Sequence, residues 1–209
     1  MRGVGGFYLE RGAVEVLGLS GKARSGKDFL AQKVAVPLGF MPLALANHFK
    51  VSAIAKGLED LPAEAMDIRQ MWEIDKDDLH RKALQLEGTE RGRKVYGDDI
   101  WCRHLEAWMY YFALKGYRRF VVTDVRFPNE VEWVKSLGGK VYRIVGRGGI
   151  TNGVANHDSE SALDGYKGFD RVLDNSPENE DRVLDVMRAA LFVDFPSLAE
   201  EATSVVKEA

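Results

Sequence analysis

The stretch Gly21-Lys22-Ala23-Arg24-Ser25-Gly26-Lys27-Asp28 decides the fold of this chain. It follows the apolar run Val14–Leu19, which is typical of a buried strand of a parallel sheet, and it opens a helical pattern over Lys27–Leu38. Two glycines separated by four residues and followed by lysine have the spacing of a phosphate-binding loop, whose backbone N–H groups point inward at an anion. The last position is normally Ser or Thr, but a carboxylate such as Asp28 can also hold magnesium. A glycine-rich turn capping an ordinary helix is the alternative, and the order strand, loop, helix argues against it.

The composition is that of a globular chain with a slight negative charge. The 209 residues are 45% hydrophobic and 29% charged, with a formal net charge of −3. This length suits one α/β domain with a sizeable core, and the absence of a general basic surface argues against a nucleic acid polymer as partner. The longest apolar run, Trp108–Leu114, is too short to span a bilayer, so no membrane partner is expected. The single cysteine, Cys102, is expected to pack in the core and fits a reducing cytoplasm.

Strand and helix patterns alternate along the chain. Strands are expected at Val14–Leu19, Met41–Leu45, Arg119–Asp124, Lys140–Val145 and Arg171–Leu173. Helices are expected at Lys27–Leu38, Phe49–Leu58, Ala63–Trp72, Lys76–Glu87, Asp99–Leu114, Asn129–Leu137 and Glu178–Phe192. This alternation predicts an α/β fold with a parallel sheet between helices. The tail Val193–Ala209 is expected to be a loose helix or partly disordered.

The carboxyl ends of the strands are where ligands bind in such a sheet. This rule places the loop after Leu19, the segment after Asp124 and the loop after Val145 around one crevice. Asp124 ends a strand and is placed to act on a magnesium ion, while Arg126 can bind a phosphate through two parallel hydrogen bonds. A surface ion pair is the alternative for both residues. Glu130, together with Asn129, can instead cap the next helix.

Two further segments carry basic side chains next to glycines. Residues 81–93 suggest a helix ending at Gly88 and a turn that exposes Thr89 and Arg93, so that Gln85 could bind a base edge and Arg93 a phosphate. A run of charged residues such as this one is more commonly the solvated face of a helix. Gly146–Asn156 is rich in glycine and polar residues, and the arginines at its base suggest a lid that closes over phosphates, or else a passive exposed connection.

Several of these segments together resemble the deoxynucleoside monophosphate kinases of bacteriophages, within the nucleoside monophosphate kinase group. They are GKARSGKD at 21–28, ANHFK at 46–50, LQLEGTERGR at 84–93, DDIW at 98–101, TDVRFPNE at 123–130 and HDSE at 157–160. The resemblance implies a three-layer α/β/α phosphate-loop kinase fold over residues 1–192, followed by a tail at 193–209. It further implies a helical monophosphate-binding region at about 46–115 and a lid at about 146–160. The implied reaction transfers the γ-phosphoryl group of ATP, with Mg²⁺, to a nucleoside or deoxynucleoside 5′-monophosphate.

The resemblance also implies roles for individual residues. ATP would be bound by Gly21, Ala23, Arg24, Ser25, Gly26, Lys27 and Asp28, and magnesium by Asp28 and Asp124. The catalytic residues would be Lys27, Arg126, Arg143 and Arg147. The monophosphate would be bound by Lys50, Arg69, Gln85, Thr89, Arg93, Trp101, Arg126, Glu130, His157 and Glu160, with Trp101 available to stack on a base. Family members often carry a hydroxyl residue where this chain has Phe29.

The sequence is also compatible with two other functions. Dephospho-coenzyme A and phosphomevalonate kinases share the phosphate loop and lid, although a base-binding Gln85 and a stacking Trp101 favour a nucleotide. A nucleotide-binding regulatory protein that hydrolyses ATP slowly is the alternative from another class. The expected partners are small-molecule nucleotides in the cytoplasm, that of the host if a phage encodes the chain. The sequence leaves open whether the chain forms a homodimer.

Overall fold

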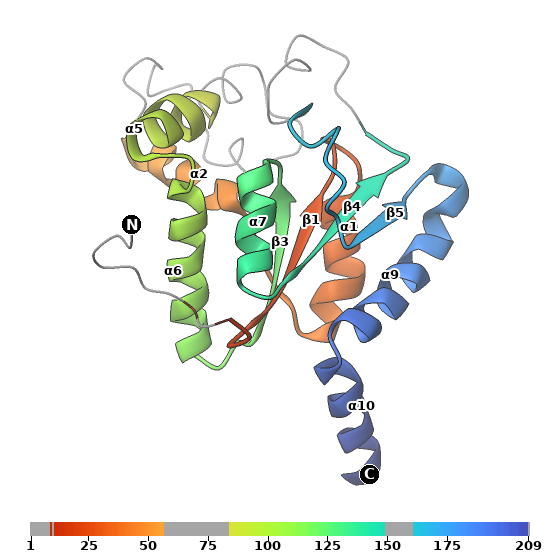
Figure 1. Ribbon diagram of the computed structural model, residues 1–209. Helices are drawn as coiled ribbons and strands as arrows, with labels where there is room; N and C mark the ends of the chain where they lie inside the picture. Colours follow the sequence, from red (N-terminus) through yellow and green to blue (C-terminus); the bar gives the residue numbers. More distant parts are fainter. Residues whose placement is uncertain (1–8, 10, 57–83, 149–160, 209) are drawn as a thin grey trace. The chain divides into compact units, whose positions relative to one another are not determined.

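The computed structural model describes residue 9 and residues 11–56, 84–148 and 161–208, and it divides into two compact units (Figure 1). The first, here called the sheet unit, comprises Met1–Leu43 and Tyr110–Ala209. The second, here called the helical unit, comprises Ala44–Met109. Each unit is described by itself.

The sheet unit is built on five parallel strands. These are β1 (Glu15–Ser20), β2 (Met41–Leu43), β3 (Arg119–Val125), β4 (Lys140–Val145) and β5 (Arg171–Asp174), in the order β2-β3-β1-β4-β5. Every neighbouring pair is parallel. The predicted α/β fold is therefore confirmed, and the expected strands lie within two residues of the observed ones.

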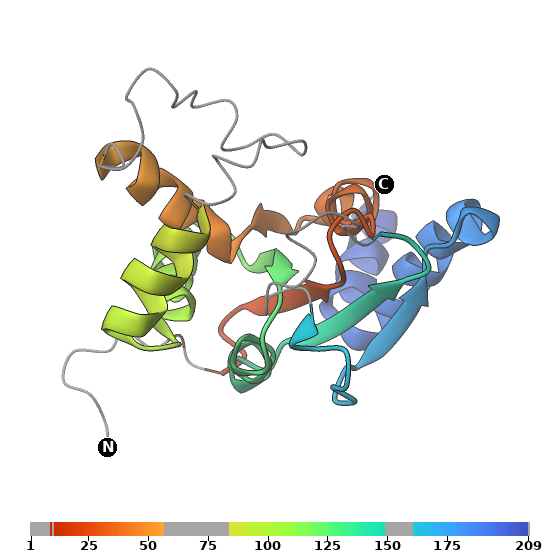
Figure 2. The ribbon, with the colours of Figure 1, turned by 90° about the horizontal axis from the view of Figure 1, so that it is seen from above.

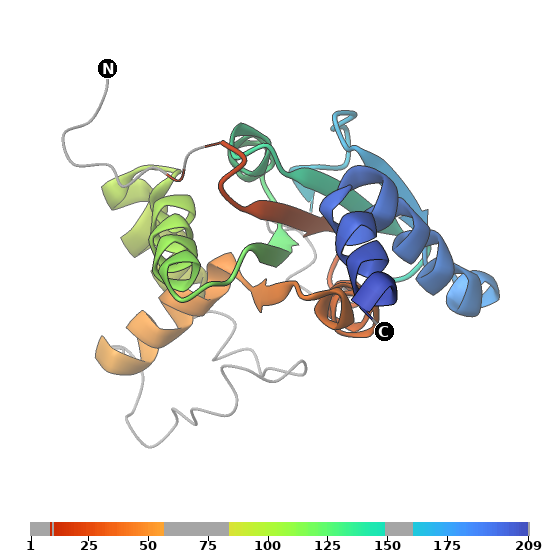
Figure 3. The same cartoon turned by 90° about the horizontal axis from the view of Figure 1, so that it is seen from below.

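Helices cover both faces of this sheet. The first follows the phosphate-binding loop as α1 (Lys27–Leu30) and continues through a π-helical stretch η1 (Ala31–Ala35) and a 3-10 turn η2 (Val36–Leu38). Helix α9 (Glu180–Asp194), preceded by the turn η5 (Pro177–Asn179), lies beside it. Figures 2 and 3 show α1 and α9 on one face and α7 (Pro128–Ser136) on the other. This arrangement gives the predicted three layers.

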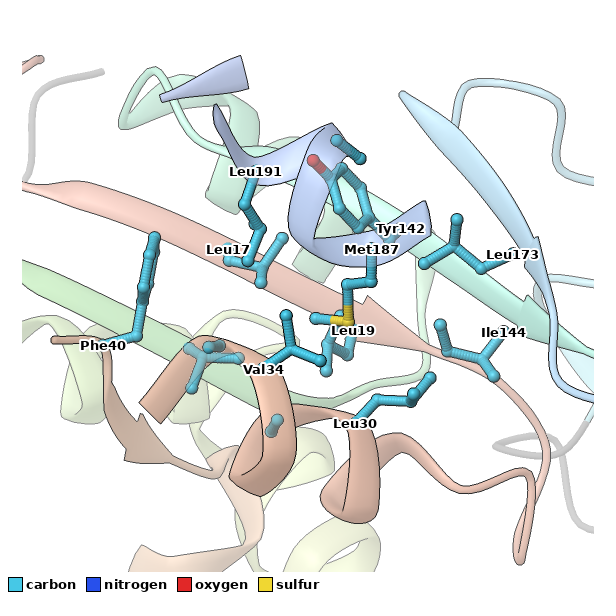
Figure 4. Packing of buried hydrophobic residues seen from close by; sticks show 14 of the residues in the cluster. Leu17, Leu19, Leu30, Val34, Phe40, Tyr142, Ile144, Leu173, Met187 and Leu191 are labelled. Atoms are coloured by element: carbon cyan, nitrogen blue, oxygen red, sulfur yellow. The ribbon is translucent and has the colours of Figure 1, made fainter. Parts of the chain in front are cut away.

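The main core lies between the sheet and the helices α1 and α9 (Figure 4). Leu17 and Leu19 of β1 contribute to it, because alternate residues of a strand point to the same face. Their partners come from the neighbouring strands and the covering helices, and include Leu30, Val34, Tyr142, Ile144, Leu173, Met187 and Leu191. Burying each large apolar side chain contributes about 1.5–3 kcal/mol, so this core fixes the central strand that carries the loop.

The C-terminal tail contains a helix, which is one of the two outcomes expected from the sequence, and the start of this helix has a defined anchor. Helix α10 (Ser197–Glu208) runs on from α9 (Figure 1), and Leu198 at its start is buried in the core. Arg119, at the beginning of β3, donates to Glu201 of α10 at 2.6 Å and to Glu15 of β1 at 2.7 Å. This anchor could not be predicted from the sequence, because Arg119 is far along the chain from both Glu15 and Glu201.

The described part of the helical unit consists of α2 (Leu45–Lys56), a π-helical stretch η4 (Leu86–Arg93), α5 (Lys94–Tyr96) and the first part of α6 (Ile100–Leu114). Helix α2 begins four residues before the expected Phe49. The predicted helix Ala63–Trp72 and most of Lys76–Glu87 lie outside the described residues.

The predicted end of a helix at Gly88 was wrong. The helix continues through Gly88 and Gly92 into α5. A Cβ on Gly88 would lie 3.5 Å from the ring of Phe49, and a Cβ on Gly92 would collide with the ring of Trp101. The two glycines therefore allow close packing against aromatic rings, a tertiary cause that the local sequence does not reveal.

Candidate active site

The phosphate-binding loop lies at the carboxyl end of β1, the central strand of the sheet. Strands β3 and β4 flank β1 in parallel, and β5 follows β4. The residues that follow these four strands therefore come to the same edge of the sheet. This edge contains the loop, Asp124, Arg143 and Arg147, which the sequence analysis had placed together.

The two glycines of the loop are required by close approaches of other groups. A Cβ on Gly21 would lie 2.5 Å from the hydroxyl of Ser25 and 2.8 Å from the carbonyl oxygen of Ile144. Gly26 has φ of +90°, a left-handed conformation, and a Cβ there would collide with the side-chain amide of Asn175. No larger residue fits at either position with the present backbone.

Lys27 lies at the centre of the loop. Its ammonium nitrogen donates to the carbonyl oxygens of Gly21 and Lys22, both at 2.8 Å, and lies 3.4 Å from the hydroxyl of Ser25. The side chain is only 6% exposed. A buried ammonium group wrapped by the loop is a strong local positive charge, which suits a phosphate ligand.

Two carboxylates can hold a metal ion at this edge of the sheet. Asp28 is exposed in the first turn of α1, and Asp124 is half-buried near the end of β3. Gly18 pairs with Val122 and Ser20 with Val125, so β3 carries one extra residue opposite Leu19. This bulge comprises Thr123 and Asp124, and bulges of this kind redirect side chains near functional sites.

Magnesium suits this donor set. It prefers one or two carboxylates and completes its shell with water and substrate phosphates. Within the described ranges, no three His, Cys, Asp or Glu side chains form a ready-made metal cluster. A metal held jointly by Asp28, Asp124 and a bound nucleotide would match the ligand preference of magnesium.

Glu130 caps helix α7, so the structure does not support its predicted role in binding the monophosphate. It is 2% exposed, and its Oε2 atom accepts hydrogen bonds from the backbone N–H groups of Arg126 at 2.6 Å and Phe127 at 3.0 Å. The helix begins at Pro128, and a glutamate at its third position can satisfy donors at the start of the helix. The cap also fixes the backbone of Arg126, whose side chain is half-buried.

The arginines of β4 and the following loop are both held by carboxylates. Arg143 donates to the hydroxyl of Ser20 at 3.0 Å and to Asp164 at 3.1 Å, and Lys22 of the loop contacts the other oxygen of Asp164 at 3.0 Å. Arg147 donates to Glu180 at 2.6 Å. Asp164 lies beyond the glycine-rich segment with no motif around it, so its contacts with Arg143 and Lys22 could not be predicted from the sequence.

The helical unit contains the other predicted site residues that the structure describes. Gln85, Thr89 and Arg93 follow one another at intervals of four on one continuous helix, so they lie along one side of it. The guanidinium of Arg93 donates to the backbone oxygen of Asp98 at 3.2 Å. Lys50 on α2 is half-buried. Arg69, His157, Glu160 and positions 149–160 of the predicted lid lie outside the described residues.

Trp101 packs inside the helical unit, so the predicted stacking of its ring on a base is not supported. The side chain is 5% exposed, and its indole N–H donates to the carbonyl oxygen of Gly88 at 2.8 Å. Its ring also lies 5.2 Å from that of Phe49. Trp101 thus supports the helix that carries Gln85, Thr89 and Arg93.

Comparison with known proteins decides the family. No family model matches the chain. A curated protein of Acanthamoeba polyphaga mimivirus, named "Putative deoxynucleotide monophosphate kinase", is 31% identical over 179 residues. The match covers 79% of this chain and 91% of that protein. The chain belongs to the deoxynucleotide monophosphate kinase family.

Membership of this family confirms the predicted class of enzyme, a phosphotransferase. It does not favour a dephospho-coenzyme A kinase, a phosphomevalonate kinase or a regulatory protein. The relative comes from a giant virus, whereas the sequence motifs resembled bacteriophage kinases. No helix in the described part of the chain is both long and apolar enough to cross a membrane.

Proposed function

We propose that this chain transfers the γ-phosphoryl group of ATP to a deoxynucleoside 5′-monophosphate. The observation that carries the proposal is the buried ammonium of Lys27 inside the loop at the end of β1, in a chain of this family. Family membership supports the class of acceptor, and the loop supports a nucleoside triphosphate as donor.

The donor is held by the sheet unit. The loop amides and Lys27 bind the β- and γ-phosphates, and the carboxylates of Asp28 and Asp124 hold Mg²⁺. When bound, Mg²⁺ would neutralise part of the negative charge on these phosphates. Phe29, which is 41% exposed, cannot supply the hydroxyl ligand that family members often have at this position, so the two carboxylates are the protein ligands.

The acceptor is held by side chains of the helical unit. Gln85, Thr89 and Arg93 form the described part of this set, and Lys50 adds a second positive charge. Gln85 can bind a base edge through paired hydrogen bonds, and Arg93 can bind the phosphate. Arg69, His157 and Glu160 complete the proposed set outside the described residues.

The reaction needs little covalent assistance from the protein. The acceptor phosphate is already anionic, so no strong general base is required, and the protein must offset the repulsion of two polyanions and exclude water. Arg126, Arg143 and Arg147 supply positive charge for this purpose. Because Arg143 and Arg147 contact Asp164 and Glu180, phosphate binding exchanges one anion for another at these side chains.

A panel of acceptors tests the proposal. ADP formation from ATP and Mg²⁺ is measured by a coupled assay with the four common deoxynucleoside monophosphates and their ribose counterparts. Dephospho-coenzyme A and phosphomevalonate complete the panel. We expect at least one deoxynucleoside monophosphate to raise the rate far above ATP hydrolysis alone. Stimulation by dephospho-coenzyme A or phosphomevalonate only, or by no acceptor, would overturn the proposal.

A further inference from the structure

Asn175 is a buried side chain that contacts the phosphate-binding loop and that the sequence analysis did not identify. It follows β5 directly, is 1% exposed, and is fixed by its backbone N–H, which donates to the carbonyl oxygen of Val145 at 2.9 Å. Its side-chain amide nitrogen donates to the carbonyl oxygen of Ser25 at 2.9 Å. The outer strand of the sheet is thereby connected to the loop on the central strand.

This hydrogen bond fixes the orientation of the peptide between Ser25 and Gly26. The described peptide bonds include no cis bond, and in a trans peptide the C=O and N–H groups point in opposite directions. Because the carbonyl oxygen of Ser25 points at Asn175, the N–H of Gly26 points away from Asn175. In a phosphate-binding loop, the orientation of each N–H group decides whether it can donate to the anion.

Packing also places Asn175 directly against the phosphate-binding loop. The amide of Asn175 occupies the space where a Cβ of Gly26 would be, so the two residues are in direct contact. On the β4 side, a Cβ on Gly148 would lie 2.7 Å from the backbone nitrogen of Ser25. The loop is therefore in close contact with residues that follow both β4 and β5.

The Oδ1 atom of Asn175 is buried and has no hydrogen-bond partner among the described residues. A buried polar atom without a partner costs stability, so packing alone would favour an apolar side chain over asparagine at this position. The hydrogen bond to Ser25 gives a reason to retain it in this position.

We propose that Asn175 is a positioning residue for the phosphates of ATP, acting through the Ser25–Gly26 peptide. This inference rests on the proposed function, because it assigns the loop to ATP. Without the hydrogen bond, the peptide can rotate, and the N–H of Gly26 is no longer held in the orientation that a bound phosphate requires. The residues proposed to bind the acceptor, Gln85, Thr89 and Arg93, belong to the helical unit, so we expect binding of the monophosphate to change less than binding of ATP.

The test compares Asn175→Ala and Asn175→Asp with Asn179→Ala. Asn179 is a matched control because its amide bonds to Asp174 and Ser176 within the same segment. The dissociation constant of ATP with Mg²⁺ is measured by calorimetry, and KM for both substrates by the coupled assay. The melting temperature without nucleotide serves as the folding check.

We expect Asn175→Ala to weaken ATP binding about tenfold while KM for the monophosphate changes less than twofold, in line with the loss of one buried hydrogen bond. Asn175→Asp should weaken it further, because its carboxylate would face the carbonyl oxygen of Ser25. Asn179→Ala should bind ATP as the wild type does. ATP binding within twofold of wild type in both Asn175 variants overturns the inference, and so does an equal loss for both substrates. If wild type binds ATP but phosphorylates no acceptor, the proposed function fails while the effect on ATP binding still tests Asn175.

Discussion

Arg143 donates to Asp164 across 3.1 Å at the carboxyl end of the sheet. The second oxygen of the same carboxylate contacts Lys22 of the phosphate-binding loop at 3.0 Å. One acidic side chain therefore holds two positive charges at the edge where we propose that ATP phosphates bind. Asp164 and a phosphate compete for the same partners.

Replacing Asp164 with Asn should lower KM for ATP by about two- to fivefold. Asp164 and Lys22 are each more than 40% exposed, so the competing ion pairs are weak and the gain is small. The measurement is initial rate against ATP concentration at low and moderate salt. Asp185→Asn, which removes the same charge from an exposed pair with Arg188 on α9, is the control and should change little. A rise in KM would show instead that Asp164 orients Lys22 and Arg143 productively.

Arg147→Ala should lower kcat about 10- to 100-fold if this arginine offsets charge in the transition state. The comparison variant is Glu180→Gln, which removes the negative charge that faces Arg147 and keeps the arginine itself. We expect Glu180→Gln to retain near-normal kcat in steady-state assays. Equal losses in the two variants would mean that the ion pair has only a structural role.

Arg93→Ala should raise KM for the monophosphate far more than KM for ATP, because Arg93 is proposed to bind the acceptor phosphate. Lys94→Ala is the neighbouring control, since Lys94 is exposed and pairs with Glu90. Varying each substrate at saturation of the other separates the two effects. A matched rise for both substrates would indicate structural damage, and an effect on ATP alone would reverse the assignment of the two sites.

Asp194 connects β4, β5 and α9 and should make stability depend on acid pH. It accepts hydrogen bonds from Tyr142 at 2.6 Å and from Arg171 at 2.7 and 2.9 Å. Burial alone would raise the pKa of Asp194, but the hydrogen bonds from Arg171 and Tyr142 outweigh it and lower the pKa below the ordinary 3.8. Because the pKa is lowered in the folded state, the stabilisation is complete above the unfolded pKa and is lost as the pH falls through the folded pKa.

Asp194→Asn should therefore reduce the free energy of unfolding by about 1.5–3 kcal/mol at pH 7, the range for hydrogen bonds to charged groups. The difference from wild type should narrow below about pH 4. Urea unfolding at several pH values measures it, with Asp185→Asn as the exposed control on the same helix. A difference that stays constant down to pH 3 would contradict this role of the carboxylate.

The sheet, and the grouping of the loops at the carboxyl ends of its strands, were predictable because their determinants are local. The largely apolar run Val14–Leu19 indicates a buried strand, and the Gly-x4-Gly-Lys spacing indicates the loop between β1 and α1. The alternation of strands and helices then places the carboxyl ends of the strands together. The patterns for strands and helices depend on the periodicity of apolar residues, and the pattern for the loop depends on a few fixed positions.

The errors arose where contacts between distant residues decide the outcome. Gly88 was predicted to end a helix, but Phe49 packs against it. The family resemblance implied that Trp101 is available to stack on a base, but its ring is buried over Gly88 and Gly92. Asn175 lies 150 positions from Ser25, and no motif marks the pair. Glu130 had two interpretations in the sequence, and only its contact with the backbone of Arg126 and Phe127 favours the cap.

In the proposed reaction, the loop around Lys27 binds ATP, and the γ-phosphoryl group of ATP is transferred to a deoxynucleoside monophosphate. The most direct measurement uses ATP labelled in the γ-phosphate and follows the label, in wild type and in Lys27→Ala, after addition of each deoxynucleoside monophosphate. We predict that the label appears in a deoxynucleoside diphosphate, and that Lys27→Ala forms it about 10²–10³-fold more slowly while remaining folded. Label released only as inorganic phosphate, or near-normal transfer by a folded Lys27→Ala variant, would contradict the proposed reaction and the role of Lys27.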